Sequence, residues 1–537
     1  MSIDIETYRL KAQEAIEYVF VKEYHNSLGI PMPIVKMLLP DDANYSTGQY
    51  YITIDKTWQI HLNFGKLPIS YHEFQNEVKV LTRHEIEHYM CCPFDVITHF
   101  RMLKRIRDVY YKHFSHLGIN IEYACGAISN QAADIIVDTK NYYRHSKETL
   151  KSEIDWIKIG ANISACPRHC KLMFLTKEAI WKEDLGINET DPEFLKIVHQ
   201  LADSFTKNGI EDKSSFLDKV EEYAEIFFKL YVEDQKNPQQ SSQQGSQQQN
   251  GQQGSQQQSG QWGVGRPKDG DEHGNAFVFA DPDKVKEAIE VLAEETSVEE
   301  FIDLLAIAGI IGMSDKQKGV LWFNVQSANI IPIVEFSNTG NKSSYTYPSV
   351  WRIGDPIEEL DLMLTYMTSP RLIPGMTTKK WGYVSNDDNG TESKQMDLLL
   401  VVDTSGSMGS AMKESANMHQ AVLASYGILS YFESTKSKVA FIGFSDKIDA
   451  YVDWSDKYDD VRERLLTNGH GGTKFPISRI KSTLDVRSRD LVTVLITNGD
   501  LGNINESVSY FRDYLNDDNK LYIFLLGGSK SLHSYEP

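Results

Sequence analysis

Residues 237 to 262 are almost entirely glutamine, serine and glycine, and this tract constrains the chain more than any other feature. Side chains of these types bury too little apolar surface to repay the entropy of ordering their backbone. Glycine and serine interspersed among the glutamines favour a flexible tether over an aggregating glutamine run. The sequence therefore predicts two functional parts that need no fixed relative orientation, joined by a linker over residues 234–268.

Composition narrows the classes of protein that the two parts can form. The 537 residues are ample for more than one buried core. A formal net charge of −20 at pH 7 argues against nucleic acid or anionic lipid as the main partner, since both repel an acidic surface. Five cysteines are not a disulfide framework in so long a chain, and their odd number fits a reducing compartment.

Two further observations concern membranes and secretion. The opening segment, through Phe20, lacks the basic and apolar regions of a signal peptide. The most apolar stretch, Phe301 to Met313, contains Asp303 and is too short to span a bilayer. We therefore expect a soluble cytoplasmic protein.

The first part, residues 1–233, is typical of a mainly helical domain. Its exception is a predicted hairpin of β-branched and aromatic residues at Tyr50–Ile54 and Thr57–Phe64. A helical pattern follows from His72 to about Met90. A later helical stretch is basic, and we interpret it as a solvated face, with a docking patch for an acidic partner as the alternative: Arg101, Lys104, Arg105, Arg107 and Lys112.

His84, Glu85 and His88 form an HExxH pattern within the predicted helix. Residues four apart share one face of a helix, so both imidazoles can reach one metal ion. Zinc suits such a site because it accepts imidazole nitrogens in a tetrahedral shell. Glu85 stands beside the first histidine, where it can accept a proton from a water that zinc activates. The alternative is a pair of ordinary helix-face histidines paired with glutamate.

A catalytic zinc site needs a third protein ligand, and Asp134 is the best candidate. It lies among alanines and aliphatic residues in the run NQAADIIVD, where an unpaired buried carboxylate is costly and a metal ion removes that cost. Asp138, one turn later on the same face, is the substitute ligand or a partner of the ligands. His99 and Glu122 are weaker choices, and a surface position for Asp134 is the alternative.

From about Lys394 buried apolar strands alternate with amphipathic helices, which predicts a parallel doubly wound sheet. The predicted strands and the helix after the first of them are Met396–Val402, Met412–Phe432 (the helix), Val439–Phe444, Leu491–Thr497 and Leu521–Leu526. The predicted fold class is multidomain: the helical first domain, a helical and irregular connecting region over residues 269–393, and an α/β domain over residues 394–537.

Asp403, Ser405 and Ser407 follow the first of these strands in a DxSxS pattern. Doubly wound folds place their ligands at the carboxyl ends of strands. One carboxylate and two hydroxyls, completed by water, make the oxygen shell that Mg²⁺ or a similar divalent cation prefers. Such a cation accepts an Asp or Glu from a partner, so the site predicts binding rather than catalysis. The alternative is that the serines only cap the following turn and helix.

This arrangement resembles the metal-ion-dependent adhesion site of von Willebrand factor type A domains. Thr473, after two glycines, matches the threonine loop of that family. Asn498 stands where the family has the aspartate of a TDG sequence, and its amide oxygen brings less charge to the cation. Asp500, two residues on, is placed to compensate. The resemblance thus implies further cation ligands at Thr473, Asn498 and Asp500, in a Rossmann-like domain.

The chain as a whole is similar to a family of predicted zinc metallopeptidases fused to carboxy-terminal type A domains. The segments HEIEH, NQAAD, WRIGDPIEELD and DTSGSM carry that resemblance. It implies a zincin-like first domain and a partner of the MoxR type of AAA+ ATPase. The chain has no GxxxxGK[ST] loop and is therefore not itself that ATPase.

We expect a zinc-dependent peptidase that holds zinc through His84, His88 and Asp134 and acts on a protein client with the ATPase. The alternative is a non-catalytic adaptor or co-chaperone of the ATPase, in which the zinc is structural or vestigial. An oxyanion stabiliser is not evident from the sequence, and the candidates for that role are Tyr142, Tyr143 and His145.

Overall fold

The protein forms two compact units, residues 1–326 and 327–537, each with a hydrophobic core of its own. The computed structural model describes residues 4–25, 27–29, 32–37, 50–54, 59–64, 70–159, 163–236, 281–310, 313–328, 349–351, 379–380, 396–467, 469–487, 491–499, 501, 503, 507–516 and 519–527. Residues 237–280 lie outside this set, so the structure does not test the predicted tether. The helices on either side of the tether both belong to the first unit.

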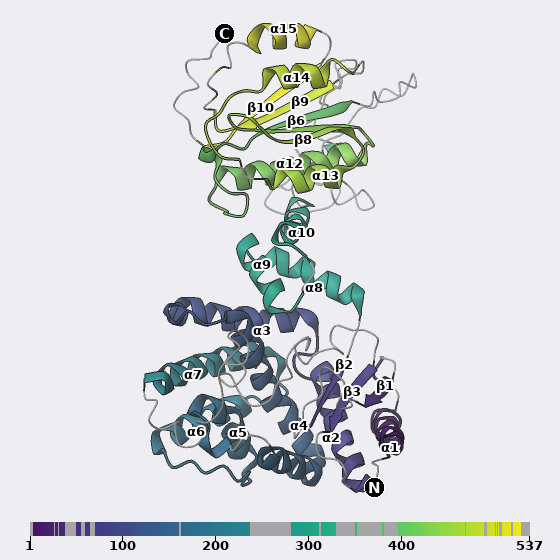
Figure 1. Ribbon diagram of the computed structural model, residues 1–537, viewed down its shortest axis with the longest axis vertical. Coiled ribbons are helices and arrows are strands. Elements are labelled where there is room, and N and C mark those ends of the chain that lie inside the picture. The colour runs from purple at the N-terminus through teal and green to yellow at the C-terminus, as the bar shows by residue number, and fades with distance from the viewer. Residues whose placement is uncertain are drawn as a thin grey trace. The chain divides into compact units, whose positions relative to one another are not determined.

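The first unit is mainly helical, as the sequence predicts (Figure 1). Its helices are α1 (Ile5–Tyr18), α2 (Tyr71–Met90), α3 (Val96–Val109), α4 (Ile121–Ile159), α5 (Arg168–Trp181), α6 (Pro192–Thr206), α7 (Phe216–Lys236), α8 (Pro282–Glu295), α9 (Val298–Ile307) and α10 (Asp315–Ala328), which runs to the boundary between the units. The backbone of α4 leaves the helical region at His145.

A small sheet accompanies the helices of the first unit. Its strands are β1 (Ile34–Met37), β2 (Tyr50–Ile54) and β3 (Gln59–Phe64), in the order β1-β3-β2. β2 and β3 pair antiparallel, which confirms the predicted hairpin, and β2 lies at the edge of the sheet. β1 pairs parallel with β3 and was not predicted, since four residues with a weak alternation are too short a signal.

Helix α2 is held between α1 and α4. Ser70 caps its N-terminus by accepting a hydrogen bond from the amide of Glu73. Phe74 and Val78 are fully buried in a cluster with Ile16 and other apolar residues of α1. The same helix also packs against α4, so the residues of α2 that do not face α1 are available to meet side chains of α4.

The basic stretch on α3 pairs with acidic residues from α7, α8 and α9. Arg101 bonds to Glu295, and Arg107 bonds to Asp303 at 2.8 Å. Arg107 is only 9% exposed. The interpretation of a solvated face is therefore wrong for Arg107, because helices that follow the tether in sequence return to cover it (Figure 1).

The second unit contains a five-stranded sheet in the order β10-β9-β6-β7-β8. Its elements are β4 (Ser349–Val350) and β5 (Lys379–Lys380), which form a separate pair, then β6 (Asp397–Asp403), α12 (Asn417–Ser434), β7 (Val439–Phe444), β8 (Ile448–Ser455), α13 (Tyr458–Leu465), α14 (Ile477–Leu484), β9 (Leu491–Thr497), α15 (Val508–Asn516) and β10 (Lys520–Leu525). Helices α12 and α13 cover one face and α14 and α15 the other (Figure 1).

The predicted sheet is correct for four strands and wrong at one edge. β10, β9, β6 and β7 are parallel, as expected for a doubly wound fold. β8 runs antiparallel beside β7 and extends the sheet. Its side chains are mostly half-buried or exposed, so it lacks the apolar run by which the other strands were recognised. The helix predicted from Met412 begins at Asn417.

None of the described helices is both long and apolar enough to cross a membrane.

Candidate metal centre

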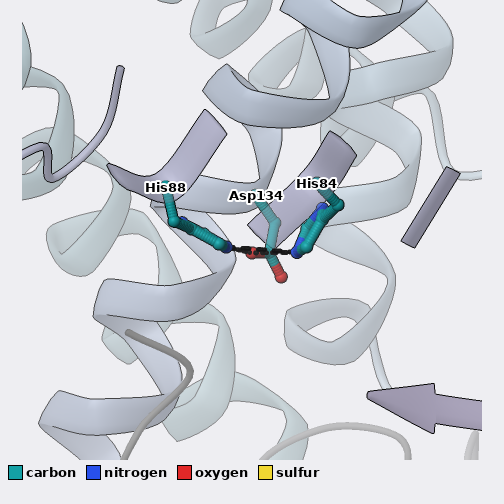
Figure 2. Close-up of side chains that lie close together, drawn as sticks. All are labelled: His84, His88 and Asp134. Carbon is teal, nitrogen blue, oxygen red and sulfur yellow. Dashed lines mark hydrogen bonds and ion pairs between the residues drawn. The ribbon is translucent and has the colours of Figure 1, made fainter. Parts of the chain in front are cut away.

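His84, His88 and Asp134 lie together between α2 and α4 (Figure 2). One possible ligand atom from each falls within 4.8 Å of the others, so the group could hold a metal ion. The two Nε2 atoms are 3.1 Å apart, and Asp134 Oδ1 lies 3.3 Å from that of His88 and 3.6 Å from that of His84. Tetrahedral zinc at 2.0–2.1 Å from nitrogen separates two such ligands by about 3.3 Å.

Each imidazole is oriented by an acceptor on its other nitrogen. His88 Nδ1 donates to the carbonyl of Cys92 at 2.9 Å, and His84 Nδ1 donates to Asp138 at 2.7 Å. A carbonyl only accepts hydrogen bonds, so a neutral His88 carries its proton on Nδ1 and a lone pair on Nε2. Both histidines therefore present Nε2 to a common point, in the tautomer that binds metal.

Asp134 is held by its neighbour on α4. Asn130, four residues earlier, donates its side-chain amide to Asp134 Oδ2 at 2.8 Å. Asp134 Oδ1 is buried, and no donor satisfies it among the described residues. Leaving a buried carboxylate oxygen unsatisfied is costly. A cation at the centre of the group would satisfy this oxygen and the two histidine lone pairs at once.

The charges around the group also fit a divalent cation. The carboxylates of Asp134, Asp138 and Glu153 are 14%, 12% and 15% exposed, and one ammonium, that of Lys177, lies among them. Burial raises the pKa of Glu153 and opposes the ionised form of Asp138, but Lys177 and His84 hold the pKa of Asp138 below its usual range. A divalent cation would add positive charge to a group in which three carboxyl side chains face a single ammonium.

The two glutamates of the HExxH pattern have different surroundings. Glu85 is half-buried, and its charge contributes to a raised pKa of His84. Glu87 is fully buried, and its carboxylate pairs with Lys140 at 2.8 Å and Arg144 at 2.9 Å. Glu87 is thus committed to an ion-pair cluster, whereas the charge of Glu85 acts on the metal group through His84.

The other candidates named from the sequence have the following surroundings. Tyr142 stacks on Trp181, and its hydroxyl donates to Glu183. Tyr143 is 59% exposed, and His145 lies where α4 loses its helical backbone. His99 and Glu122 belong to α3 and the start of α4 and are not members of the group: His99 is buried and Glu122 exposed.

Hydrogen bonds bring four of the six predicted cation ligands of the second unit together. Asp403, at the end of β6, accepts from the amide of Ser405 at 2.9 Å. The hydroxyls of Ser405 and Ser407 are 3.1 Å apart, and Asn498 donates its amide to Ser407 at 2.8 Å. Asn498 Oδ1 is buried, and among the described residues no donor reaches it. These residues come from the carboxyl ends of β6 and β9, which are neighbours in the sheet.

The remaining two predicted ligands are less directly placed. The amide of Gly406 donates to the carbonyl of Gly471, which brings the loop containing Thr473 beside the serines. The structure gives no contact of the Thr473 side chain with Asp403. Asp500 lies outside the described residues. Thr497, which was not predicted, donates its hydroxyl to Asp403 Oδ2 at 2.7 Å.

The sequence did not assign roles to Asn130, Glu153 or Lys177. Asn130 carried a usable signal, since it lies four residues before Asp134 on the same helical face. Lys177 and Glu153 carried none, because a lysine on α5 and a glutamate late in α4 look like surface residues. Neither a known family model nor a curated protein matches this chain. The geometry of the two sites therefore has to carry the functional conclusion.

Proposed function

We propose that the first unit is a zinc-dependent peptidase. The observation that carries this proposal is the convergence of the lone pairs of His84 and His88, on the HExxH helix, with the unsatisfied carboxylate oxygen of Asp134 from α4. His84, His88 and Asp134 would hold the ion, and three is the number of protein ligands that catalytic zinc sites use. Bound zinc supplies a Lewis acid that activates water near neutral pH.

The residues of the chain then supply proton transfer and substrate alignment. Glu85 accepts the proton of the attacking water and returns it to the leaving amine. β2 contacts α2, and its outer side pairs with no strand that the structure describes. An extended polypeptide can add to such an edge by main-chain hydrogen bonds, which would present a peptide bond to the site.

Metal content of the purified chain tests this proposal. We expect about one zinc per chain by mass spectrometry, lost in His84→Ala and Asp134→Ala. His99→Ala is the matched control, because it removes a buried histidine outside the group and should keep the metal. Glu85→Ala should keep zinc but slow cleavage of an unfolded protein substrate by about 10²–10⁴-fold. A parent chain without zinc, or unchanged cleavage by Glu85→Ala, would refute the peptidase.

The second unit favours an additional role in binding. The cluster of Asp403, Ser405, Ser407 and Asn498, with its unsatisfied amide oxygen, suits Mg²⁺ with few protein charges. We propose that it binds a carboxylate of a protein partner through the cation, as in type A domains. The partner would be a MoxR-type AAA+ ATPase, in the cytoplasm, and this part of the proposal draws on the family resemblance alone.

A second experiment distinguishes the peptidase from the non-catalytic adaptor. With a co-expressed MoxR-type ATPase, we expect association in Mg²⁺ that is lost in chelator and in Asp403→Ala. If this association holds while the parent chain contains no zinc, the adaptor is the better description. Association that survives Asp403→Ala would remove the cation from the binding role.

A further inference from the structure

A buried chain of charges leads from the metal group to helix α5. Asp138 uses its two carboxylate oxygens on two partners: Oδ1 accepts from His84 Nδ1 at 2.7 Å, and Oδ2 accepts from Lys177 Nζ at 2.5 Å. Lys177 Nζ also donates to Glu153 at 3.0 Å. Helix α5, which the HExxH pattern does not include, is thereby connected to a metal ligand through one intervening side chain.

Lys177 is unusual in how completely it is enclosed. Only 2% of the residue is exposed, and it lies in a run of buried residues on α5 that includes Phe174 and Thr176. Burial lowers the pKa of this ammonium, but Asp138 and Glu153 outweigh burial and raise it. Transferring a charged group from water to a buried position costs several kcal/mol of free energy. An apolar residue of similar volume commonly packs at such a position without loss of stability. A buried lysine at this position therefore calls for a role other than stability.

We propose that Lys177 is a positioning residue for the metal centre, acting through Asp138 on His84. This inference rests on the proposed zinc site. With one oxygen on His84 and the other on Lys177, the carboxylate of Asp138 cannot rotate without losing a charge-assisted hydrogen bond. A fixed carboxylate in turn fixes the tautomer and the ring orientation of the histidine, which is how partners of metal ligands tune a site.

Glu153 is the second carboxylate that accepts a hydrogen bond from the Lys177 ammonium. It gives Lys177 a second acceptor, so the ammonium is held between two carboxylates rather than being drawn to one. Without Lys177, Asp138 would lose its second partner and the ring of His84 would sample more orientations. The metal would then bind less tightly and in a less uniform geometry.

Lys177→Met tests the proposal, and Lys171→Met is its matched control. Lys171 lies on the same helix, is 8% exposed and pairs at 2.9 Å with Glu189, which is not a member of the metal group. Zinc affinity is measured by competition with a chromophoric chelator, and geometry by the visible absorption spectrum of the Co²⁺-substituted chain. We expect Lys177→Met to weaken zinc binding about tenfold and to change the Co²⁺ spectrum, as for other partners of metal ligands. Lys171→Met should leave both unchanged.

Glu153→Gln keeps the test decisive if Lys177→Met does not fold. It removes one negative charge beside the ammonium without changing size, and we expect a spectral change in the same direction with a smaller loss of affinity. A parent chain that binds zinc, together with parent-like affinity and spectrum in the variants, would overturn the role of Lys177 alone. A parent chain that binds neither zinc nor Co²⁺ would overturn the proposed peptidase and this inference with it.

Discussion

The two histidines of the metal group differ in the charge of the partner that orients them. His88 donates to a neutral carbonyl, whereas His84 donates to a carboxylate and lies 3.6 Å from a second. Burial lowers the pKa of His84, but Asp138 and Asp134 outweigh burial and raise it to about 10. Protons and metal therefore compete for His84 over the whole neutral range, because the metal binds only the unprotonated nitrogen.

This raised pKa predicts how stability varies with pH in a chain kept free of metal by a chelator. The pKa of an unfolded histidine is about 6.5. A group whose pKa is higher in the folded state stabilises fully below the unfolded pKa and loses that contribution as pH rises through the folded pKa. We expect the denaturation midpoint in urea to fall between pH 6.5 and about 10. His84→Ala should lack this component, and an equal slope in both chains would contradict the assignment.

At the scale of elements, α3 packs against helices from both sides of the tether, and α4 also contacts α9. Helix α3 packs against α7 on one side and against α8 and α9 on the other. The contact with α8 and α9 has an apolar component, since Phe301 and Leu305 are fully buried, and an ionic one around Arg107. The sequence predicted a helical connecting region here, but neither its division into α8 and α9 nor the surface that these helices cover.

Replacing Arg107 should separate the ionic part of this contact from its apolar part. Arg107 is 11% exposed in its side chain and pairs with Asp303 at 2.8 Å, whereas Arg105 is 45% exposed and pairs with Glu221 at 3.0 Å. We expect Arg107→Ala to lower the free energy of unfolding of the first unit by about 1–2 kcal/mol. Arg105→Ala should stay within about 0.5 kcal/mol of the parent in calorimetry. An equal loss of unfolding free energy in the two variants would mean that the burial of Arg107 adds nothing to stability.

At the scale of the whole molecule, the low-complexity tract interrupts the first unit. α7 ends at Lys236 and α8 begins at Pro282, and both lie within the unit that spans residues 1–326. The predicted boundaries at residues 233 and 393 stay predictions, but the compact units divide at residue 326. The helices after the tether thus belong structurally with the unit that contains the metal group.

Cutting the tract tests this organisation. With a protease site inserted into residues 237–262, we expect the two fragments to remain associated after cleavage, because α8 and α9 bury Leu292, Phe301 and Leu304 against the first unit. Gel filtration of the cut protein at moderate salt should show one species of parental size. Separation into two peaks would show that the tract joins independent domains instead.

The sequence alone determined those secondary-structure elements and site residues that depend on the spacing of neighbouring residues. The HExxH helix follows from a period of 3.6 residues, the hairpin before it from β-branched and aromatic residues, and the four parallel strands from continuous apolar runs. All of these are properties of neighbouring residues. Only the tertiary structure decided which acid joins the histidines: Asp134 and Asp138 share a helical face, but packing of α2 on α4 puts the first at the Nε2 atoms and the second at Nδ1. Lys177 and the helices that cover Arg107 likewise reach their partners across long stretches of chain, and no local pattern encodes contacts between segments so far apart.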